Sequence, residues 1–294
     1  MAAPSAPTST TITNEAFKKF GIASPSSAQA TRAIDYILEA VKDDIWKLSK
    51  KWRSLQTFDY VPTVSGVPHY QAPTDFQSDL QIILLDGNSR STLATGSASA
   101  PVLNSAETAA KSDVEGKLLL ITAGTGVNQA KHVKTYTVAS QTCAMAENYT
   151  LAPATGDSYL IVTSHHPLGA VKAIRDYDRI MSPGLLARPT EAFHVPDTAE
   201  GDFYLYPVPD KVYGLLRRYY SNLKELDLAG TLYTRILWQW RDVFTLGCFY
   251  YLCADYGDKR TKDADKDYRN ALMQLKATEV DGLDMSNLQR HVEE

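Results

Sequence analysis

Two stretches of the chain repeat apolar residues at helical spacing, one near each end. Within residues 231–255, Ile236, Trp240 and Val243 follow one another at steps of four and three, and Phe244 flanks this row. The apolar band is therefore wide, as in a helix buried in a protein core. Charged residues interrupt the stretch, which argues against a membrane span. The pattern predicts a long core helix that other segments must cover.

The second stretch, residues 30–55, is amphipathic along its whole length. Its apolar positions alternate steps of four and three, and most of the other positions are charged. Ser26 and Gln29 have capping-box spacing at its start. Since neither helix can bury its apolar face alone, we expect the two helices to pack together. The residues expected in this contact are Leu38, Ile45, Trp52, Ile236, Trp240 and Phe244.

Between the two helices the apolar period changes to two, which predicts short strands. Residues 58–64 and 67–71 are separated by a Ser-Gly turn and predict a hairpin. Residues 94–112 are small and polar and predict a linker. The strands and turns that follow, between residues 114 and 164, predict a small β-barrel or sandwich inserted into a host domain.

The sequence as a whole predicts an α+β fold, in which a platform of long amphipathic helices carries short antiparallel strands and the inserted β module. We expect a flexible N-terminal arm at residues 1–25, because its start is rich in Ala, Pro, Ser and Thr. Residues 26–94 and 165–280 would form the core. Residues 95–164 would hold the linker and the inserted module, and residues 281–294 a C-terminal tail.

Bulk properties exclude several classes of protein. A formal net charge of −4 gives no support for a protein that holds nucleic acid by overall charge. Three cysteines are too few and too scattered for a disulfide framework or a zinc site. The first residues lack the basic and apolar regions of a signal peptide. We therefore expect a soluble chain, made in the cytoplasm, with no membrane partner.

Three patterns imitate catalytic or metal-binding motifs. Gly124 and Gly126 precede Lys131, but the second glycine and the Lys-Ser/Thr pair of a phosphate-binding loop are missing, so a β-turn is predicted. Asp263 begins a run of alternating acids whose later positions do not match a calcium loop. Adjacent histidines at 165 and 166 are expected to be plain loop residues. The sequence therefore predicts no catalytic residue, no metal and no cofactor, and a non-enzymatic assembly protein.

Three segments, in a fixed order, resemble the head-to-tail adaptor (connector) proteins of tailed bacteriophages. The first is KWRSL at 51–55, followed by VSGVPHY at 64–70 and APTDF at 72–76. The second is LYPVPD at 205–210, which leads into a tyrosine-rich strand. The third is the long helix with the polar helix and tail that follow it. The inserted module also resembles a small β module that recurs in phage neck and tail proteins.

The resemblance implies a structural virion protein at the head-tail junction. Adaptors of this family form rings, usually dodecameric, beneath the portal protein ring. Genomic DNA passes through the lumen without sequence-specific binding, and lower tail, nozzle or tail-fibre proteins attach to the ring. The family pattern carries over no catalytic residue. An alternative from another class is a receptor- or carbohydrate-contacting tail protein that uses the β module, and a cell-wall hydrolase is a third.

The tail is the segment expected to dock on the portal. It has no core-forming pattern, yet it is not purely polar. Its apolar residues are spaced for shallow pockets rather than for one helical stripe. They are Leu283, Met285, Leu288 and Val292.

Overall fold

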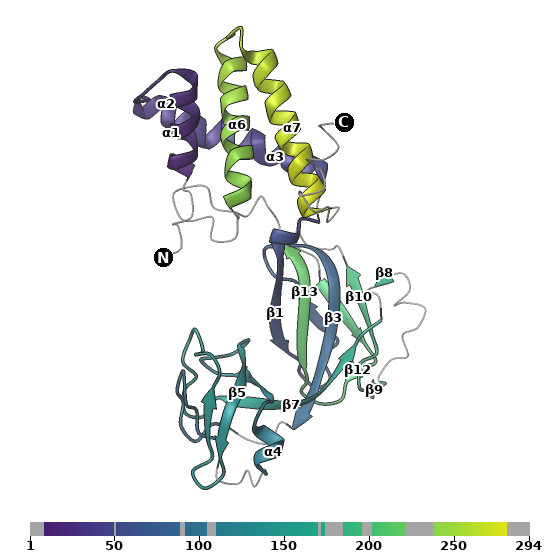
Figure 1. Cartoon of the computed structure of the whole chain (residues 1–294). Helices are drawn as coiled ribbons and strands as arrows, with labels where there is room; N and C mark the ends of the chain where they lie inside the picture. The colour runs from purple at the N-terminus through teal and green to yellow at the C-terminus, as the bar shows by residue number, and fades with distance from the viewer. Residues whose placement is uncertain are drawn as a thin grey trace, which may run out of the picture. The chain divides into compact units, whose positions relative to one another are not determined.

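The computed structural model describes residues 9–49, 51–88, 92–104, 110–169, 172–173, 185–195, 202–221 and 238–280. The fold is mixed α+β with mostly antiparallel sheets, as the sequence predicts. The chain divides into two compact units (Figure 1). The helical unit comprises residues 1–56 and 220–294, and the β unit comprises residues 57–219.

The helical unit is built from both ends of the chain. In Figure 1, α6 runs beside α7 and has α1 on its other side, and contacts between these helices support this arrangement. No helix of the described residues is long and apolar enough to cross a membrane. The helices are α1 (Ser9–Phe20), α2 (Ser27–Arg32), a π-helical turn (Ala33–Ile37), α3 (Leu38–Leu48), a 3-10 turn (Arg53–Leu55), α6 (Trp238–Asp255) and α7 (Thr261–Glu279).

The helix predicted at residues 30–55 begins as expected but ends early. Ser26 and Gln29 form the predicted capping box, with the Ser26 N–H donating to Gln29 Oε1 at 2.9 Å. At the other end, Ser49 takes an extended backbone conformation, so the helix stops at Leu48. Trp52 therefore lies beyond the helix, and its indole Nε1–H donates to the Ser49 carbonyl at 2.8 Å. The prediction of a continuous helix to residue 55 is wrong.

The N-terminal segment is more ordered than the sequence predicts. Residues 9–20 form α1, and Ile12, Ala16 and Phe17 are at most 1% exposed in the core of the helical unit. Their spacing of four and one puts them on one helical face, which packs against other helices. The prediction of a flexible arm over residues 1–25 is therefore wrong from Ser9 onward. Residues 1–8 lie outside the described residues.

The strands of the β unit form a seven-stranded, a four-stranded and a two-stranded sheet among the described residues. Their orders are β1-β13-β3-β7-β4-β5-β6, β2-β11-β10-β8 and β12-β9. The strands are β1 (Gln56–Pro62), β2 (His69–Gln71), β3 (Phe76–Asn88), β4 (Leu118–Ala123), β5 (Ala130–Thr137), β6 (Thr142–Met145), β7 (Ser158–Pro167), β8 (Lys172–Ala173), β9 (Leu186–Ala187), β10 (Glu191–Val195), β11 (Asp202–Tyr206), β12 (Val208–Pro209) and β13 (Gly214–Ser221). A short helix, α4 (Lys111–Val114), precedes β4.

Strand β7 belongs to two parts of the β unit at once. On one side it pairs with β3, from Ile83 opposite Pro167 to Asn88 opposite Ile161. On the other side it pairs with β4. The ladder of hydrogen bonds is therefore continuous across the boundary predicted at residue 164. The helices and strands that the sequence assigns to one core, 26–94 and 165–280, instead fall into different units.

The predicted linker also contributes to packing. Leu93 and Leu103 are nearly or fully buried in the same apolar cluster as Tyr136 and Tyr159 of the module. Leu93 lies just before the predicted linker and Leu103 within it, so the segment is attached to the module at both points. The linker expected at residues 94–112 is thus attached to the module's core through Leu103.

The predicted hairpin of residues 58–71 does not form. Strand β1 pairs with β13, whereas β2 pairs with β11 of the other sheet. The turn between them is closed by Tyr70, whose hydroxyl donates to the Val67 carbonyl at 2.7 Å and accepts from the Val64 N–H at 3.0 Å. The chain therefore changes sheets at this turn.

The seven-stranded sheet folds over on itself. Gly214 of β13 lies so close to β4 that a Cβ atom there would sit 2.5 Å from Leu120 Cδ2. Leu120 and Leu85 share a buried cluster with Leu216, and Tyr60 of β1 packs against it. This fold-over brings β1, at one edge of the sheet, toward β4 and β5.

Candidate functional site

The glycine-rich turn after β4 holds a carboxylate of its own chain. Asp157 Oδ2 accepts hydrogen bonds from the Gly126 N–H at 3.0 Å and the Ala154 N–H at 2.9 Å. Burial raises the pKa of Asp157, but the N–H groups of Ala154, Gly126 and Thr125 outweigh burial and leave the pKa below its ordinary value. The donors that a phosphate-binding loop would offer to its ligand are thus used inside the fold.

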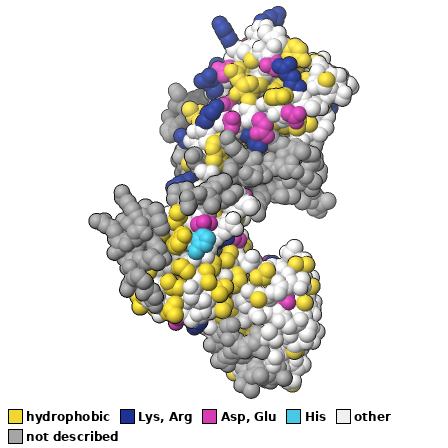
Figure 2. Space-filling view, turned by 180° about the vertical axis from the view of Figure 1, so that it is seen from behind, with side chains coloured by type: hydrophobic (Ala, Val, Ile, Leu, Met, Phe, Trp, Pro, Cys, Tyr) yellow, Lys and Arg dark blue, Asp and Glu magenta, His cyan; other side chains and the backbone are white. Residues whose placement is uncertain are grey.

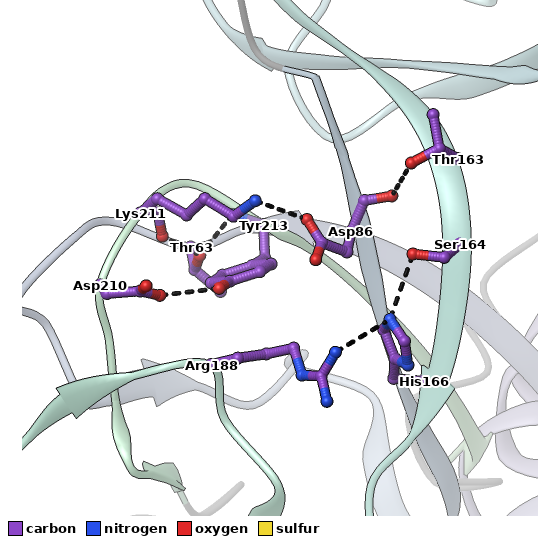
Figure 3. A network of polar contacts seen from close by, with 9 residues as sticks. All are labelled: Thr63, Asp86, Thr163, Ser164, His166, Arg188, Asp210, Lys211 and Tyr213. Carbon is purple, nitrogen blue, oxygen red and sulfur yellow. Dashed lines mark hydrogen bonds and ion pairs between the residues drawn. The ribbon is translucent and has the colours of Figure 1, made fainter. Parts of the chain in front are cut away.

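The two adjacent histidines are strand residues, not the loop residues that the sequence predicts. Both lie in β7, where neighbouring side chains point to opposite faces of the sheet. His166 Nε2 lies 3.1 Å from Ser164 Oγ and 3.4 Å from Arg188 Nη1 (Figure 3). His165 and His166 therefore cannot hold one metal ion together.

The acidic run at the start of α7 is likewise used locally. Asp263 lies in the first turn, and Asp265 accepts from Arg269 at 2.9 Å one turn later. Within the described residues, no group of three or more His, Cys, Asp or Glu side chains could hold a metal ion. The cysteines are buried, and burial raises the pKa of the Cys143 thiol to about 12.

A polar network joins β3 and β7 to the loop before β13 (Figure 3). Lys211 Nζ lies 2.7 Å from Asp86 Oδ1, and the Tyr213 hydroxyl donates to Asp210 Oδ1 at 2.7 Å. Thr63 Oγ1 accepts from the Tyr213 N–H at 2.8 Å. Each acidic side chain of the network has a donor from the same unit. The arrangement fixes the loop relative to the sheet.

A second polar group ties the two larger sheets together. Arg217 of β13 is 3% exposed and holds Asp59 of β1 in a bidentate contact. Its Nη1 also donates to the Gln71 carbonyl of β2 at 2.7 Å, and its guanidinium lies over the Phe203 ring. Sequence reasoning missed this group, because nothing in the spacing of Asp59 and Arg217 indicates that they meet.

Two of the family-like segments lie against each other. The Gly66 N–H donates to the Pro209 carbonyl, and the Leu205 N–H donates to the Pro68 carbonyl, both at 2.8 Å. Ser65 Oγ donates to the Asp210 carbonyl at 2.9 Å. Segments 64–70 and 205–210, far apart in sequence, thus form one structural feature.

The helical unit has a hollow of about 410 Å³ lined by tyrosines of α6 and α7. Asp44 of α3 accepts from the Tyr251 hydroxyl at 2.7 Å and lies 3.6 Å from Lys47 Nζ. Burial, then the hydrogen bond to Asp44, raises the pKa of Tyr251. Met273 is 64% exposed at the rim. We refer to this feature as the tyrosine hollow.

The β unit has a second hollow, of about 390 Å³, where β1 approaches β5. Phe58 is 60% exposed, and its ring meets Tyr60 edge-on at 5.7 Å. Lys131 Nζ pairs with Glu147 Oε2 at 2.8 Å. We refer to this feature as the β1–β5 hollow.

Figure 2 shows hydrophobic side chains gathered over the β unit and charged side chains over the helical unit.

The predicted helix-packing residues that the structure describes lie together in one core. Leu38, Ile45, Trp52, Trp240 and Phe244 all lie in a single buried cluster of the helical unit. The other predicted site residues lie outside the described residues: Ile236 of the long helix, and Leu283, Met285, Leu288 and Val292 of the tail.

No protein-family model matches the chain, and no curated protein matches it.

Proposed function

We propose that this protein is a structural virion component that forms the ring-shaped head-to-tail adaptor of a tailed bacteriophage. The ring would sit beneath the portal, give the genome a passage and offer a docking surface to tail components. The proposal assigns no catalytic residue, metal or cofactor to the chain. It begins from the order of the three segments that resemble the adaptor family.

The observation that carries the proposal is the contact between segments 64–70 and 205–210. If the resemblance were a chance similarity of unrelated stretches, nothing would require them to meet. Instead, two backbone hydrogen bonds join them, at Gly66 with Pro209 and at Pro68 with Leu205. The third segment, with α6 and α7, packs with α1 and α3 in one helical unit.

The division into two units suggests a separate role for each part of the chain. In this proposal, the helical unit is the platform, and the strands from β4 to β7 act as the inserted β module that contacts an outer tail protein. The tail of residues 281–294 would dock on the portal. The assembly would be a homo-oligomer, expected to be a dodecamer, located at the virion neck.

Exposed side chains on both units are suited to subunit contacts. Tyr36 of the helical unit is 72% exposed, and Val64 of the β unit is 57% exposed. Tyrosine and methionine are enriched in protein–protein interfaces, and Met273 adds a third large apolar side chain in water. A ring would cover such residues with neighbouring copies. A net charge of −4 is compatible with a lumen through which DNA slides.

The test is the assembly state of the full chain, alone and mixed with purified portal rings of the same phage. Negative-stain images should show rings with a central hole, and sedimentation should place the protein with the portal. Monomers that do not co-sediment with portal rings would overturn the proposal. A trimeric knob or fibre would favour the receptor-contacting alternative instead.

A further inference from the structure

The β1–β5 hollow combines an aromatic wall with polar side chains. Phe58 and Tyr60 lie two positions apart and therefore on one face of β1. Tyr60 packs against the buried cluster that contains Leu118 and Ala130, which also line the hollow. Phe58, by contrast, is 60% exposed and extends this apolar surface into water. An exposed aromatic ring at the edge of a hollow can stack against a flat apolar face of a ligand.

The opposite wall supplies hydrogen-bonding groups. Asn128, His132 and Thr150 are exposed and line the hollow. Gln129 contributes mainly to the shape of this wall. Its Nε2 donates to the Leu151 carbonyl and its Oε1 accepts from the Leu151 N–H, both at 3.0 Å. The Gln129 amide therefore ties this wall to the backbone at Leu151, while the exposed polar side chains are available to a ligand.

The charged side chains of the hollow favour a neutral ligand. Lys131 is paired with Glu147, whose side chain is 75% exposed, so the two opposite charges compensate each other within the wall. An anionic ligand would approach the Glu147 carboxylate as well as the Lys131 ammonium. A neutral ligand with one apolar face and several hydroxyl groups fits better.

We propose that the β1–β5 hollow is a saccharide-binding site, in which a neutral sugar ring stacks on Phe58 and its hydroxyl groups bond the side chains opposite. The site lies wholly within the β unit. Sugar binding at this site therefore does not require ring formation, and an adaptor with this site would also contact a glycan surface.

Single-stranded nucleic acid is the competing ligand. Burial raises the pKa of Tyr60, and the nearby positive charges of Arg218 and Lys131 reduce this rise without cancelling it. Bases stack on aromatic rings as sugars do. The exposed Glu147 carboxylate opposes a phosphate chain, and for this reason we favour the sugar.

The test uses the full chain on an array of neutral polysaccharides, with a fluorescent dT15 oligonucleotide as the competing probe. We expect binding to at least one polysaccharide. Phe58→Ala should weaken that binding about tenfold by removing the stacking surface, and Phe58→Tyr should retain it. Val138→Ala, which removes a side chain that is 51% exposed in the same unit and lies outside the hollow, is the matched control and should bind as the parent does.

A second variant tests whether a loss of binding by Phe58→Ala comes from the site itself or from misfolding. Ala146 is exposed and lines the hollow opposite β1, so Ala146→Trp should fill the space and reduce binding while the melting temperature stays near that of the parent. Three results would each overturn the proposal: no binding to any polysaccharide, unchanged binding by both Phe58→Ala and Ala146→Trp, or binding of dT15 alone.

Discussion

Trp52 and Trp240 meet edge to face in the helical unit, with ring centroids 5.2 Å apart and an interplanar angle of 66°. Both residues are 0% exposed. Trp52 comes from the segment after α3, and Trp240 from the first turns of α6. The contact joins the two ends of the chain, and Trp240 also stacks against Phe244 of its own helix.

Removing either indole should destabilise the helical unit strongly. We expect Trp52→Ala or Trp240→Ala to lower the free energy of unfolding by about 3–5 kcal/mol, since each leaves a large cavity. Urea unfolding followed by circular dichroism measures this change. Lys262→Ala, at an exposed position of α7, should leave stability within about 0.5 kcal/mol of the parent. A tryptophan variant that melts within a degree or two of the parent would show that the residue is not part of the core.

The period of apolar residues was enough to predict these helices and their contact, because burying one face is a local requirement of each segment. The end of the first helix was not predictable in the same way. Positions 49–55 keep the helical period, yet Ser49 is extended and Trp52 reaches the core from a turn. The same apolar residues can thus be buried either by a continuous helix or by a helix that ends in a turn. Tertiary packing determines which of the two forms.

Arg217 should be essential to the β unit. Arg217→Met keeps most of the side-chain volume but leaves the Asp59 carboxylate and the Gln71 carbonyl without their donor. Breaking a fully buried ion pair on one side costs about 3–5 kcal/mol. We expect a loss below this range, because the Asp59 side chain is 29% exposed and water partly solvates it. Thermal unfolding measures it. Arg218→Met is the matched control, because Arg218 is its exposed neighbour on the same strand and should change stability little.

Asp157 should make the stability of the module depend on pH. The pKa of Asp157 is lowered in the folded protein, so its carboxylate stabilises the fold above the unfolded pKa of about 3.9. This stabilisation is lost as the pH falls through the folded value. At pH 7, Asp157→Asn should cost about 1–3 kcal/mol, because the amide cannot accept both N–H groups as well as the carboxylate does.

The measurement for Asp157 is the denaturant midpoint at pH 7 and at pH 3. The difference between parent and Asp157→Asn should be large at pH 7 and smaller at pH 3. Glu147→Gln is the control in the same module, since Glu147 is 75% exposed and its pairing with Lys131 is worth little in water. An Asp157 difference that is equal at both pH values would contradict a role for the charged carboxylate.

The polar sites were less predictable than the helices for a physical reason. The turn at Gly124 and Gly126 could be predicted from its glycines, but the partner of its N–H groups, Asp157, comes from a turn about thirty residues later. Likewise, the alternation of residues 58–71 indicates strands without saying which strands pair. Pairing across sheets depends on contacts between distant segments, and period alone carries no information about these.

The tail of residues 281–294, which lies outside the described residues, is the segment that we expect to dock on the portal. Its apolar side chains, such as Leu283 and Met285, would be anchored in portal pockets. Burying about three of them would yield about 1.5–3 kcal/mol each before the cost of ordering the segment. Repetition around a ring multiplies such a weak contact through effective concentration. Truncation after Val280 should therefore leave ring formation intact and abolish co-sedimentation with portal rings.

The control for this truncation separates the apolar anchors from the tail's length and charge. A full-length variant with Leu283, Met285, Leu288 and Val292 all changed to Ser keeps both, and it should lose portal binding as the truncated protein does. Melting temperatures near that of the parent would show that neither change disturbs the helical unit, where α7 ends at Glu279. If the truncated protein sediments with portal rings as well as the intact chain, the docking surface lies elsewhere, since no anchor of the tail would then remain to account for the binding.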